Sequence, residues 1–198
     1  DYNVYIKKGC EFLELPAPKN LDEVLDGLLI LYSHVPSITT FPVYIGRLDM
    51  LLDPFITDEE QDYIKIKRFL NHVDKTVPDS FCHANIGPYD TKAGRLILKA
   101  VIELEAPTPN MTIRYDKSKT SREFAELAAK ACLLVSKPSF ANDAYYISDL
   151  GEQYGIASCY NALPECGGAY TLTRLRLGTI ARACKTVDEM VNELLPRV

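Results

Sequence analysis

Helix-type segments alternate along this chain with short strand-type runs, and this alternation constrains the fold more than any other feature. Residues 20–34 ("NLDEVLDGLLILYSH") repeat apolar residues at helical spacing. Residues 79–87 ("DSFCHANIG") form a short mixed run bounded by a proline and a glycine, as a buried strand does. Helices that alternate with isolated strands predict an α/β fold, built as a layered sheet or a barrel, rather than an all-α bundle.

Several of the expected helices begin at residues that commonly cap a helix. Asn20 and Thr57 are each followed three positions later by a glutamate, which is the spacing of a capping box. Thr91 and Ser121 stand directly before further amphipathic segments and are expected to cap them. Pro36 is expected to end the first helix, because proline removes a helical hydrogen bond.

Strands are expected where apolar, aromatic and β-branched residues form short runs between turn signals. These runs are residues 37–46, 79–87, 111–116, 144–149, 154–160 and 169–177. No internal repeat and no long linker divides the chain, so we expect residues 1–198 to form a single domain.

The composition and charge of the chain exclude several classes of partner. Hydrophobic residues make up 47% and charged residues 25% of the 198 positions, as in ordinary globular domains. The net charge of -5 provides no basic surface for a nucleic acid. Apolar runs such as residues 28–31 are far shorter than the roughly 20 residues of a membrane helix. The N-terminus shows no secretion signal, so we expect a cytoplasmic protein that binds neither membrane nor nucleic acid.

The cysteines are expected to be reduced thiols. They lie at positions 10, 82, 132, 159, 166 and 184, a spacing without a C-x2-C pair. Among the histidines only His83 adjoins a cysteine, so we expect no structural zinc site and no other metal. The chain also lacks the G-x-G-x-x-G, Walker, G-x-S-x-G and H-E-x-x-H signatures, so the sequence indicates no routine nucleotide-binding or hydrolase function.

Four segments stand out in chain order: "PNMTIRYD" (109–116), the alanine-rich helix at 121–135, "KPSFANDAYYISDL" (137–150) and "YGIASCYNALPECGGAYTLTRLRLGTIARACKT" (154–186). Together, in this order and at these separations, they resemble the glycyl radical enzymes, the superfamily of pyruvate formate-lyase. The pieces "FPVYIGRLDMLLDPF" (41–55), "DSFCHANIGP" (79–88) and "SCYNALP" (158–164) are similar to the YjjI-type subgroup. The resemblance spans most of the chain.

The resemblance implies a radical relay. In such enzymes a glycyl radical near the C-terminus takes a hydrogen atom from a cysteine on a central finger loop, and the thiyl radical then attacks a C–H bond of a small-molecule substrate. By this resemblance Cys159 carries the thiyl radical. Ser158 stands where pyruvate formate-lyase has a second cysteine, which counts against pyruvate cleavage. A radical-activating enzyme with S-adenosylmethionine and an iron–sulfur cluster installs the glycyl radical, so no cofactor is expected on this segment itself.

The resemblance also implies a fold larger than this chain. The family fold is a barrel of two antiparallel half-sheets wrapped by helices. The chain shows no C-terminal glycine loop, since Gly178 has the wrong context. We therefore expect residues 1–198 to be a central segment of a longer enzyme, with antiparallel half-barrel strands, and to be inactive in isolation. Its further partners would be the remainder of the parent chain and, through an exposed sheet edge, a second copy in a homodimer.

The residues around Cys159 fit this role independently of the family. Residues 154–163 contain no Lys, Arg or His and include several apolar side chains, which keep a thiol protonated and shield a radical. Gly155 and Pro164 supply turn-forming residues at the ends of the segment. The alternative is that Cys159 is a packing cysteine at the end of a strand. Cys166 is expected to be structural or merely exposed.

Other polar residues are candidates for binding a substrate. His83 with Asn85, and Arg174 with Arg176, occupy alternate positions of expected strands and so share a face. The expected substrate-binding residues are Ser158, His83, Asn85, Arg114, Arg174 and Arg176. The simpler alternatives are a satisfied core histidine and arginines that serve the surface or ion pairs.

Two further alternatives stay open. Arg114 and Asp116 share a strand face, and on that ground they would pair with each other rather than bind a ligand. The whole chain could also be a non-catalytic α/β domain that binds a partner or a small ligand, in which case the cysteine loop is only structural.

Overall fold

The computed structural model describes residues 2–39, 42–77, 82–157, 161–164 and 177–194. By their internal contacts, Asp1–Glu165 and Cys166–Val198 form two separate compact units. None of the helices in the described ranges is long and apolar enough to cross a membrane.

The larger unit is built on a four-stranded parallel sheet whose strands lie in sequence order, β1-β2-β3-β4. The strands are β1 (Val43–Arg47), β2 (Cys82–Ile86), β3 (Asn110–Tyr115) and β4 (Ser139–Asn142). Parallel neighbours need a crossover connection, which is almost always right-handed. When the strands follow one another in sequence order, such crossovers place all their helices on the same face of the sheet.

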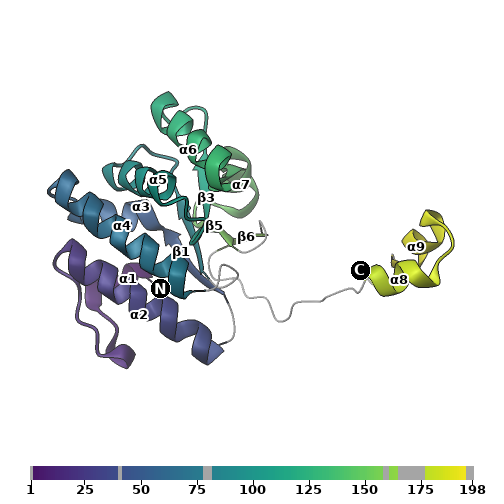
Figure 1. The fold of residues 1–198 in the computed structure, drawn as a ribbon, viewed down its shortest axis with the longest axis horizontal. Helices are drawn as coiled ribbons and strands as arrows, with labels where there is room; N and C mark the ends of the chain where they lie inside the picture. Colours follow the sequence, from purple (N-terminus) through teal and green to yellow (C-terminus); the bar gives the residue numbers. More distant parts are fainter. Residues whose placement is uncertain (1, 40–41, 78–81, 158–160, 165–176, 195–198) are drawn as a thin grey trace. The chain divides into compact units, whose positions relative to one another are not determined.

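The helices that precede and connect the strands lie together on one side of the sheet (Figure 1). They are α1 (Tyr2–Lys8), α2 (Leu21–Thr39), α3 (Leu48–Leu52), α4 (Glu59–Thr76), α5 (Lys92–Leu104) and α6 (Arg122–Val135), with the short 3-10 helices η1 (Glu11–Leu13) and η2 (Asp53–Phe55). Helix α5 packs between α4 and α6. This layer of helices on a sheet confirms the α/β class predicted from the sequence.

The face of the sheet beneath these helices is apolar and forms the main core. Alternate strand residues supply its buried side chains, which are Val43, Ile45, Cys82, Ala84, Ile86, Met111 and Ile113. The helices add large buried side chains such as Leu28, Ile66 and Phe124. Full burial of one such large side chain contributes roughly 1.5–3 kcal/mol, so this layer supplies most of the stability of the unit.

The opposite face of the same sheet is polar. It carries Tyr44, His83, Asn85, Thr112 and Arg114 at the alternate positions of β1, β2 and β3. All of them except the half-buried Tyr44 are buried. Buried polar side chains need partners, and the crossover helices lie on the other side of the sheet.

A short helix and a β-hairpin follow β4 and cover part of this polar face. They are α7 (Asp143–Leu150), β5 (Tyr154–Ala157) and β6 (Asn161–Pro164), and the two strands pair antiparallel in a sheet of their own. Helix α7 packs on β3, and β5 packs on β2. A small second core forms here from Ala141, Tyr154 and Ile156 with flanking Tyr146, Ile147, Leu150 and Ala162.

Two sequence-based predictions differ from this architecture. The antiparallel arrangement expected for half-barrel strands is not confirmed, because the strands of the four-stranded sheet are all parallel. Each pair is joined through at least one helix, which carries the chain back to the starting edge. The strand expected at 144–149 is wrong, since α7 occupies these residues. Asn142 caps that helix by accepting a hydrogen bond from the N–H of Tyr145 at 3.2 Å.

The starts of the helices follow the predicted caps closely. Asn20, Thr91 and Ser121 each accept a hydrogen bond from the N–H three residues later, at 3.0 to 3.1 Å. Helix α4 is capped one residue later than expected, by Asp58, which accepts from two N–H groups of the first turn. Helix α2 runs past Pro36 to Thr39, so the prediction that Pro36 ends this helix is wrong.

The smaller unit contains two short helices, α8 (Leu177–Ala183) and α9 (Val187–Leu194). Thr186 caps α9 by accepting from the N–H of Glu189 at 3.2 Å, and the Glu189 carboxylate accepts from the N–H of Lys185 at 2.7 Å. Most of the strand expected at 169–177 lies outside the described residues.

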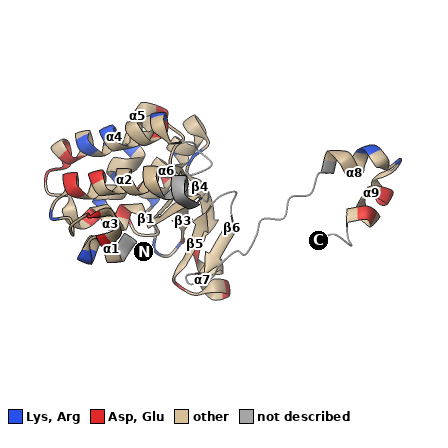
Figure 2. Ribbon diagram, turned by 90° about the horizontal axis from the view of Figure 1, so that it is seen from below, with Lys and Arg blue, Asp and Glu red and all other residues tan. Residues whose placement is uncertain are grey.

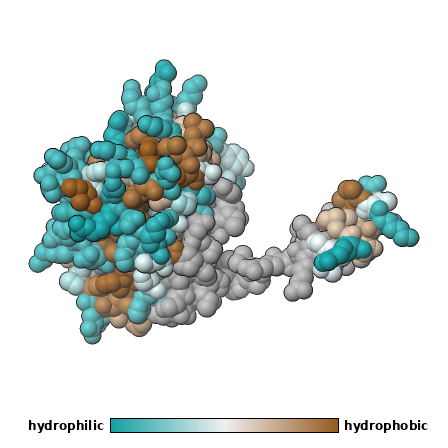
Figure 3. Space-filling model, in the orientation of Figure 1, coloured by the Kyte–Doolittle hydropathy of each residue, from teal (hydrophilic) through white to brown (hydrophobic). Residues whose placement is uncertain are grey.

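Charged side chains concentrate on the helices of the larger unit, whereas β5 and β6 carry none (Figure 2). On the face seen in Figure 3, hydrophilic residues surround several separate hydrophobic patches. The helical side is therefore an ordinary solvated surface, and the buried polar side chains of β2 and β3 lie on the other face of the sheet.

Candidate active site

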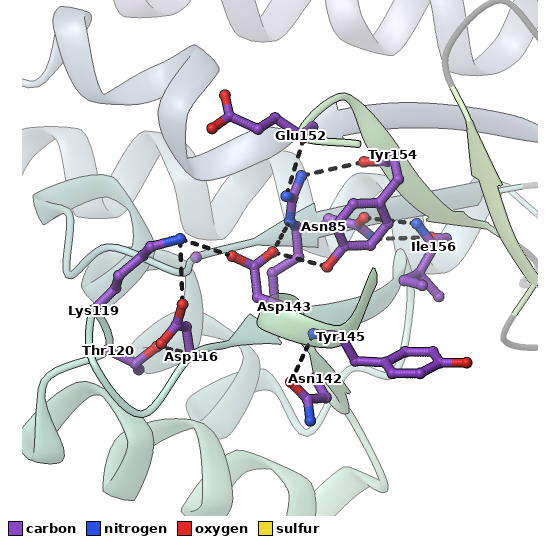
Figure 4. Close-up of polar contacts among 12 residues, drawn as sticks. Asn85, Asp116, Lys119, Thr120, Asn142, Asp143, Tyr145, Glu152, Tyr154 and Ile156 are labelled. Atoms are coloured by element: carbon purple, nitrogen blue, oxygen red, sulfur yellow. Dashed lines mark hydrogen bonds and ion pairs between the residues drawn. The ribbon is translucent and has the colours of Figure 1, made fainter. Parts of the chain in front are cut away.

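Asn85 of β2 binds the backbone of β5 through both ends of its side-chain amide (Figure 4). Its Nδ2 donates to the carbonyl oxygen of Ile156 at 2.8 Å, and its Oδ1 accepts from the N–H of Ile156 at 2.9 Å. The amide thus offers Ile156 the donor and the acceptor that a neighbouring strand would offer. Both residues are buried, so water does not compete for these bonds.

Tyr44 of β1 supports this contact from the neighbouring strand. Its hydroxyl donates to Asn85 Oδ1 at 2.9 Å. Burial raises the pKa of Tyr44 to about 12, so the hydroxyl remains a donor at neutral pH. The ring lies directly against Gly155, where a Cβ atom would be 2.3 Å from the hydroxyl oxygen. Glycine is therefore needed at this position for β5 to approach the sheet.

Arg114 of β3 holds the chain at the start of β5. Its Nη2 donates to the carbonyl of Glu152 at 3.2 Å and its Nη1 to the carbonyl of Tyr154 at 3.1 Å. The guanidinium carbon lies 4.0 Å from the centre of the Tyr154 ring, a stacked arrangement. Two side chains of the sheet, Arg114 and Asn85, therefore bind the backbone at residues 152, 154 and 156.

Asp143, the first residue of α7, balances the charge of Arg114. It is completely buried, and its Oδ1 accepts from Arg114 Nε at 2.7 Å and from the Tyr154 hydroxyl at 2.8 Å. Lys119 Nζ lies 3.6 Å from the other carboxylate oxygen. Burial, followed by the hydrogen bond to Asp143, raises the pKa of Tyr154, so this hydroxyl also remains a donor.

The ion pair of Arg114 with Asp116 that the sequence suggested is wrong. Asp116 instead accepts from the hydroxyl of Ser118 at 2.6 Å and from its N–H at 2.8 Å, and it pairs with Lys119 at 3.2 Å. These contacts, led by the Ser118 hydroxyl, lower the pKa of Asp116. Asp116 thus organises the turn after β3, while Arg114 turns toward α7 and β5.

The predicted site residues fall into two groups. Asn85 and Arg114 are brought together with β5, and His83 is buried two positions before Asn85 on the same face of β2. Three of the expected substrate-binding residues and both loop cysteines lie outside the described residues, namely Ser158, Arg174, Arg176, Cys159 and Cys166. The described strands on either side of residues 158–160 are β5 and β6, whose last pair before that connection is Ala157 with Asn161.

Sequence reasoning missed the contributions of Tyr44 and Asp143. Tyr44 alternates with the buried Val43 and Ile45, so its position on the polar face could have been read from the strand pattern. Asp143 stands beside Asn142 in a polar pair next to an aromatic run, which is a helix-start signal. Neither pattern indicates which distant residue is the partner.

A second buried carboxyl lies outside this cluster, on α3. Asp49 is completely buried, and its Oδ2 accepts from the N–H of Gly87 at 2.9 Å and from the Thr91 hydroxyl at 3.2 Å. Its Oδ1 has no hydrogen-bond partner among the described residues. Burial raises the pKa of Asp49 to about 6, against the opposing effect of these hydrogen bonds. Among all the residues that the structure describes, no group of three or more His, Cys, Asp or Glu side chains is placed to hold a metal ion.

Comparison with known proteins identifies the family of the chain. Residues 1–198 match the family model described as "Glycyl radical enzyme YjjI-like". The chain is 91% identical over 198 residues to an "Uncharacterized protein" of Haemophilus influenzae, covering 100% of this chain and 38% of that protein. It is 44% identical over 199 residues to the "Uncharacterized protein YjjI" of Escherichia coli (strain K12), covering 99% of this chain and 39% of that protein. The chain thus spans about two fifths of the length of these curated relatives. Because the family model matches along its whole length, the chain belongs to the YjjI-like glycyl radical enzymes.

Proposed function

We propose that this chain is the central segment of a glycyl radical enzyme in which Cys159 carries a thiyl radical. The observation that carries the proposal is the place of Cys159 in the chain. It falls in the connection between β5 and β6, and β5 is bound to the polar face of the sheet by Asn85 and Arg114. Membership of the glycyl radical family supplies the matching radical partner.

The proposed chemistry is two successive hydrogen-atom transfers. In the first, the S–H bond of Cys159 breaks homolytically, the hydrogen atom forms a C–H bond at the glycyl radical, and the unpaired electron stays on sulfur. In the second, the thiyl sulfur takes a hydrogen atom from a substrate C–H bond, which restores the thiol and leaves a substrate radical. The apolar segment around Cys159 favours the neutral thiol that the first step requires.

The polar face of the four-stranded sheet is, in this proposal, the side that faces the reaction. The sheet would form part of the family barrel, with its helices outside and the remainder of the parent chain closing the other side. The parent chain would also supply the glycine loop, and a radical-activating enzyme with S-adenosylmethionine and an iron–sulfur cluster would install the radical. We further propose that residues 1–198 act as one segment without a bound cofactor, inactive when isolated and able to self-associate as a homodimer.

The substrate is proposed to be a small organic molecule that reacts in a lyase or dehydratase type of reaction. Ser158 in place of a second thiol disfavours chemistry in which a neighbouring cysteine holds an acyl group. Ser158, Arg174 and Arg176 remain proposed substrate contacts, and the arginines suit a carboxylate or a phosphate. His83 is a further proposed substrate contact, and it is buried on the same face of β2 as Asn85.

The test measures hydrogen exchange through the cysteine in the full-length parent, activated anaerobically by its activating enzyme. The unpaired electron of a glycyl radical couples to one hydrogen on its Cα and gives a doublet in electron paramagnetic resonance. In D2O the thiol becomes S–D, and reversible transfer places deuterium on that Cα. We expect the doublet to collapse to a single line without any need to know the substrate.

The matched variants are Cys159→Ser and Cys166→Ser, which make the same change on both sides of β6. Cys159→Ser should form the glycyl radical normally but keep its doublet in D2O, because an O–H bond is too strong to exchange with the radical. Cys166→Ser should collapse like the unmodified protein. A Cys159→Ser variant that loses its doublet at the unmodified rate would refute the assigned role, because another residue would then exchange hydrogen with the glycyl radical.

A further inference from the structure

We propose that Asn85 is a positioning residue for Cys159, and this inference rests on the proposed function of that cysteine. The side-chain amide of Asn85 hydrogen-bonds to the N–H and the carbonyl of Ile156. Cys159 lies three residues after Ile156 in the chain. Asn85 therefore sets the point from which the 158–160 connection departs. In this role its amide acts on the protein backbone and not on the substrate.

The hairpin that carries Cys159 needs such an anchor. Strands β5 and β6 pair with each other in a two-stranded sheet, separate from the four-stranded sheet. An isolated two-stranded hairpin is marginally stable at best in water. The described hydrogen bonds that tie the β5 backbone to the large sheet come from the side chains of Asn85 and Arg114.

These two side chains bind different parts of the chain along β5. Arg114 binds the carbonyls of Glu152 and Tyr154, where the chain enters the strand. Asn85 binds Ile156, one residue before the end of β5 on the side of Cys159. Asn85 is thus the anchor nearest to the reacting sulfur along the chain.

The geometry around the Asn85 amide is tightly constrained. Tyr44 donates to the same Oδ1 that receives the N–H of Ile156, so this oxygen accepts two hydrogen bonds and cannot turn away. The Tyr44 ring also fills the space over Gly155. A buried amide with all these hydrogen bonds fixes the distance of β5 from the sheet. This distance matters because the rate of a transfer reaction falls steeply when the reacting atoms are misplaced by about 1 Å.

The test again uses the activated full-length parent in D2O. Asn85→Leu replaces the amide by an apolar side chain of similar size. We expect an unchanged yield of glycyl radical, because the variant leaves the glycine and the activating enzyme untouched. The collapse of the doublet should slow by at least about tenfold, because the thiol is no longer held at the transfer distance. Hydrogen exchange with mass spectrometry should show in parallel that the N–H of Ile156 has lost protection.

The matched control is Asn20→Leu, which removes an exposed amide at the start of α2. The doublet of this control should collapse at the same rate as that of the unmodified protein. Cys159→Ser separates the two hypotheses. If the doublet of Cys159→Ser collapses as fast as that of the unmodified protein, the proposed function fails. If Cys159→Ser prevents the collapse of the doublet while the doublet of Asn85→Leu collapses at the unmodified rate, the positioning role alone is overturned.

A milder variant keeps the inference testable if Asn85→Leu does not fold. Tyr44→Phe removes one hydrogen bond from Asn85 Oδ1 and leaves the ring over Gly155. We expect the doublet to collapse about two- to fivefold more slowly, as for the loss of one buried hydrogen bond. In that case an unmodified rate in Tyr44→Phe overturns the positioning role.

Discussion

The side-chain amide of Asn85 hydrogen-bonds to both backbone groups of Ile156, although the two residues lie 71 positions apart in the chain. The side chain of Asn85 thereby makes the two hydrogen bonds to β5 that the backbone of a neighbouring strand would otherwise make. This arrangement joins the β5–β6 hairpin to the polar face of the sheet through side chains instead of a continuous ladder. Substitutions at the contact should therefore act on the hairpin more than on the sheet itself.

Gly155→Ala should destabilise the fold by about 1–3 kcal/mol, because the new methyl group would overlap the Tyr44 ring. To make room the tyrosine must move and give up its hydrogen bond to Asn85. Urea unfolding followed by circular dichroism measures the effect. Gly46→Ala is the control, since a Cβ there meets no atom within 4 Å, and it should change the unfolding free energy by less than about 0.5 kcal/mol. Equal effects of the two substitutions would contradict the steric argument.

Arg114→Met should cost about 3–5 kcal/mol of unfolding free energy, because it leaves Asp143 charged and completely buried. The same substitution at Arg122 removes a pair with Glu126 in which both side chains are mostly exposed, 87% and 63%. That control should cost less than about 1 kcal/mol. Urea unfolding of both variants gives the comparison, and a small loss for Arg114→Met would mean that Lys119 alone balances Asp143.

Asp49→Asn should change the pH dependence of stability. Burial raises the pKa of Asp49 from 3.8 to about 6, so the folded chain binds this proton more tightly than the unfolded chain. The stability that Asp49 contributes by protonation is fully present below about pH 4 and is lost as the pH rises through about 6. Relative to the variant, the unmodified chain should lose up to about 3 kcal/mol between pH 4 and pH 7.5. Parallel unfolding curves at both pH values, differing by a constant, would show that Asp49 keeps an ordinary pKa.

Thr91→Val should weaken two contacts at once. The hydroxyl caps α5 by accepting from the N–H of Gly94, and it donates to Asp49. Its loss should cost about 1–2 kcal/mol. It should also raise the pKa of Asp49 further, because this hydrogen bond favours the charged carboxylate. Thr91→Ser keeps both contacts and is the control, measured by unfolding across the same pH range. If the serine variant lost as much stability as the valine variant, the hydroxyl would not be the cause.

Local features of the fold were predictable because neighbouring residues decide them. Asn20, Thr91 and Ser121 cap their helices through hydrogen bonds that span three residues, so the sequence itself contains both partners. The strand prediction for residues 144–149 rests on Tyr145, Tyr146 and Ile147, three aromatic or β-branched residues in a row. The Asn142 cap just before them outweighs that preference and starts a helix.

The candidate site was predictable only in part because its contacts join distant segments. Strand alternation placed His83 and Asn85 on the same face, which the structure confirms. The same alternation offered Asp116 as the partner of Arg114, but the actual partner, Asp143, arrives 29 positions later on another element. No local pattern encodes which backbone group a buried amide or guanidinium will bind.

The sequence order of the four strands has a consequence for how the protein is made. Each new strand pairs with the one synthesised just before it, so the sheet can grow by one unit at a time as the chain leaves the ribosome. Asn85 and Arg114 precede residues 152–156 in the chain, so the surface that receives the hairpin already exists when the hairpin emerges. Synthesis from the N-terminus therefore presents the side chains that bind the hairpin before the hairpin itself is made.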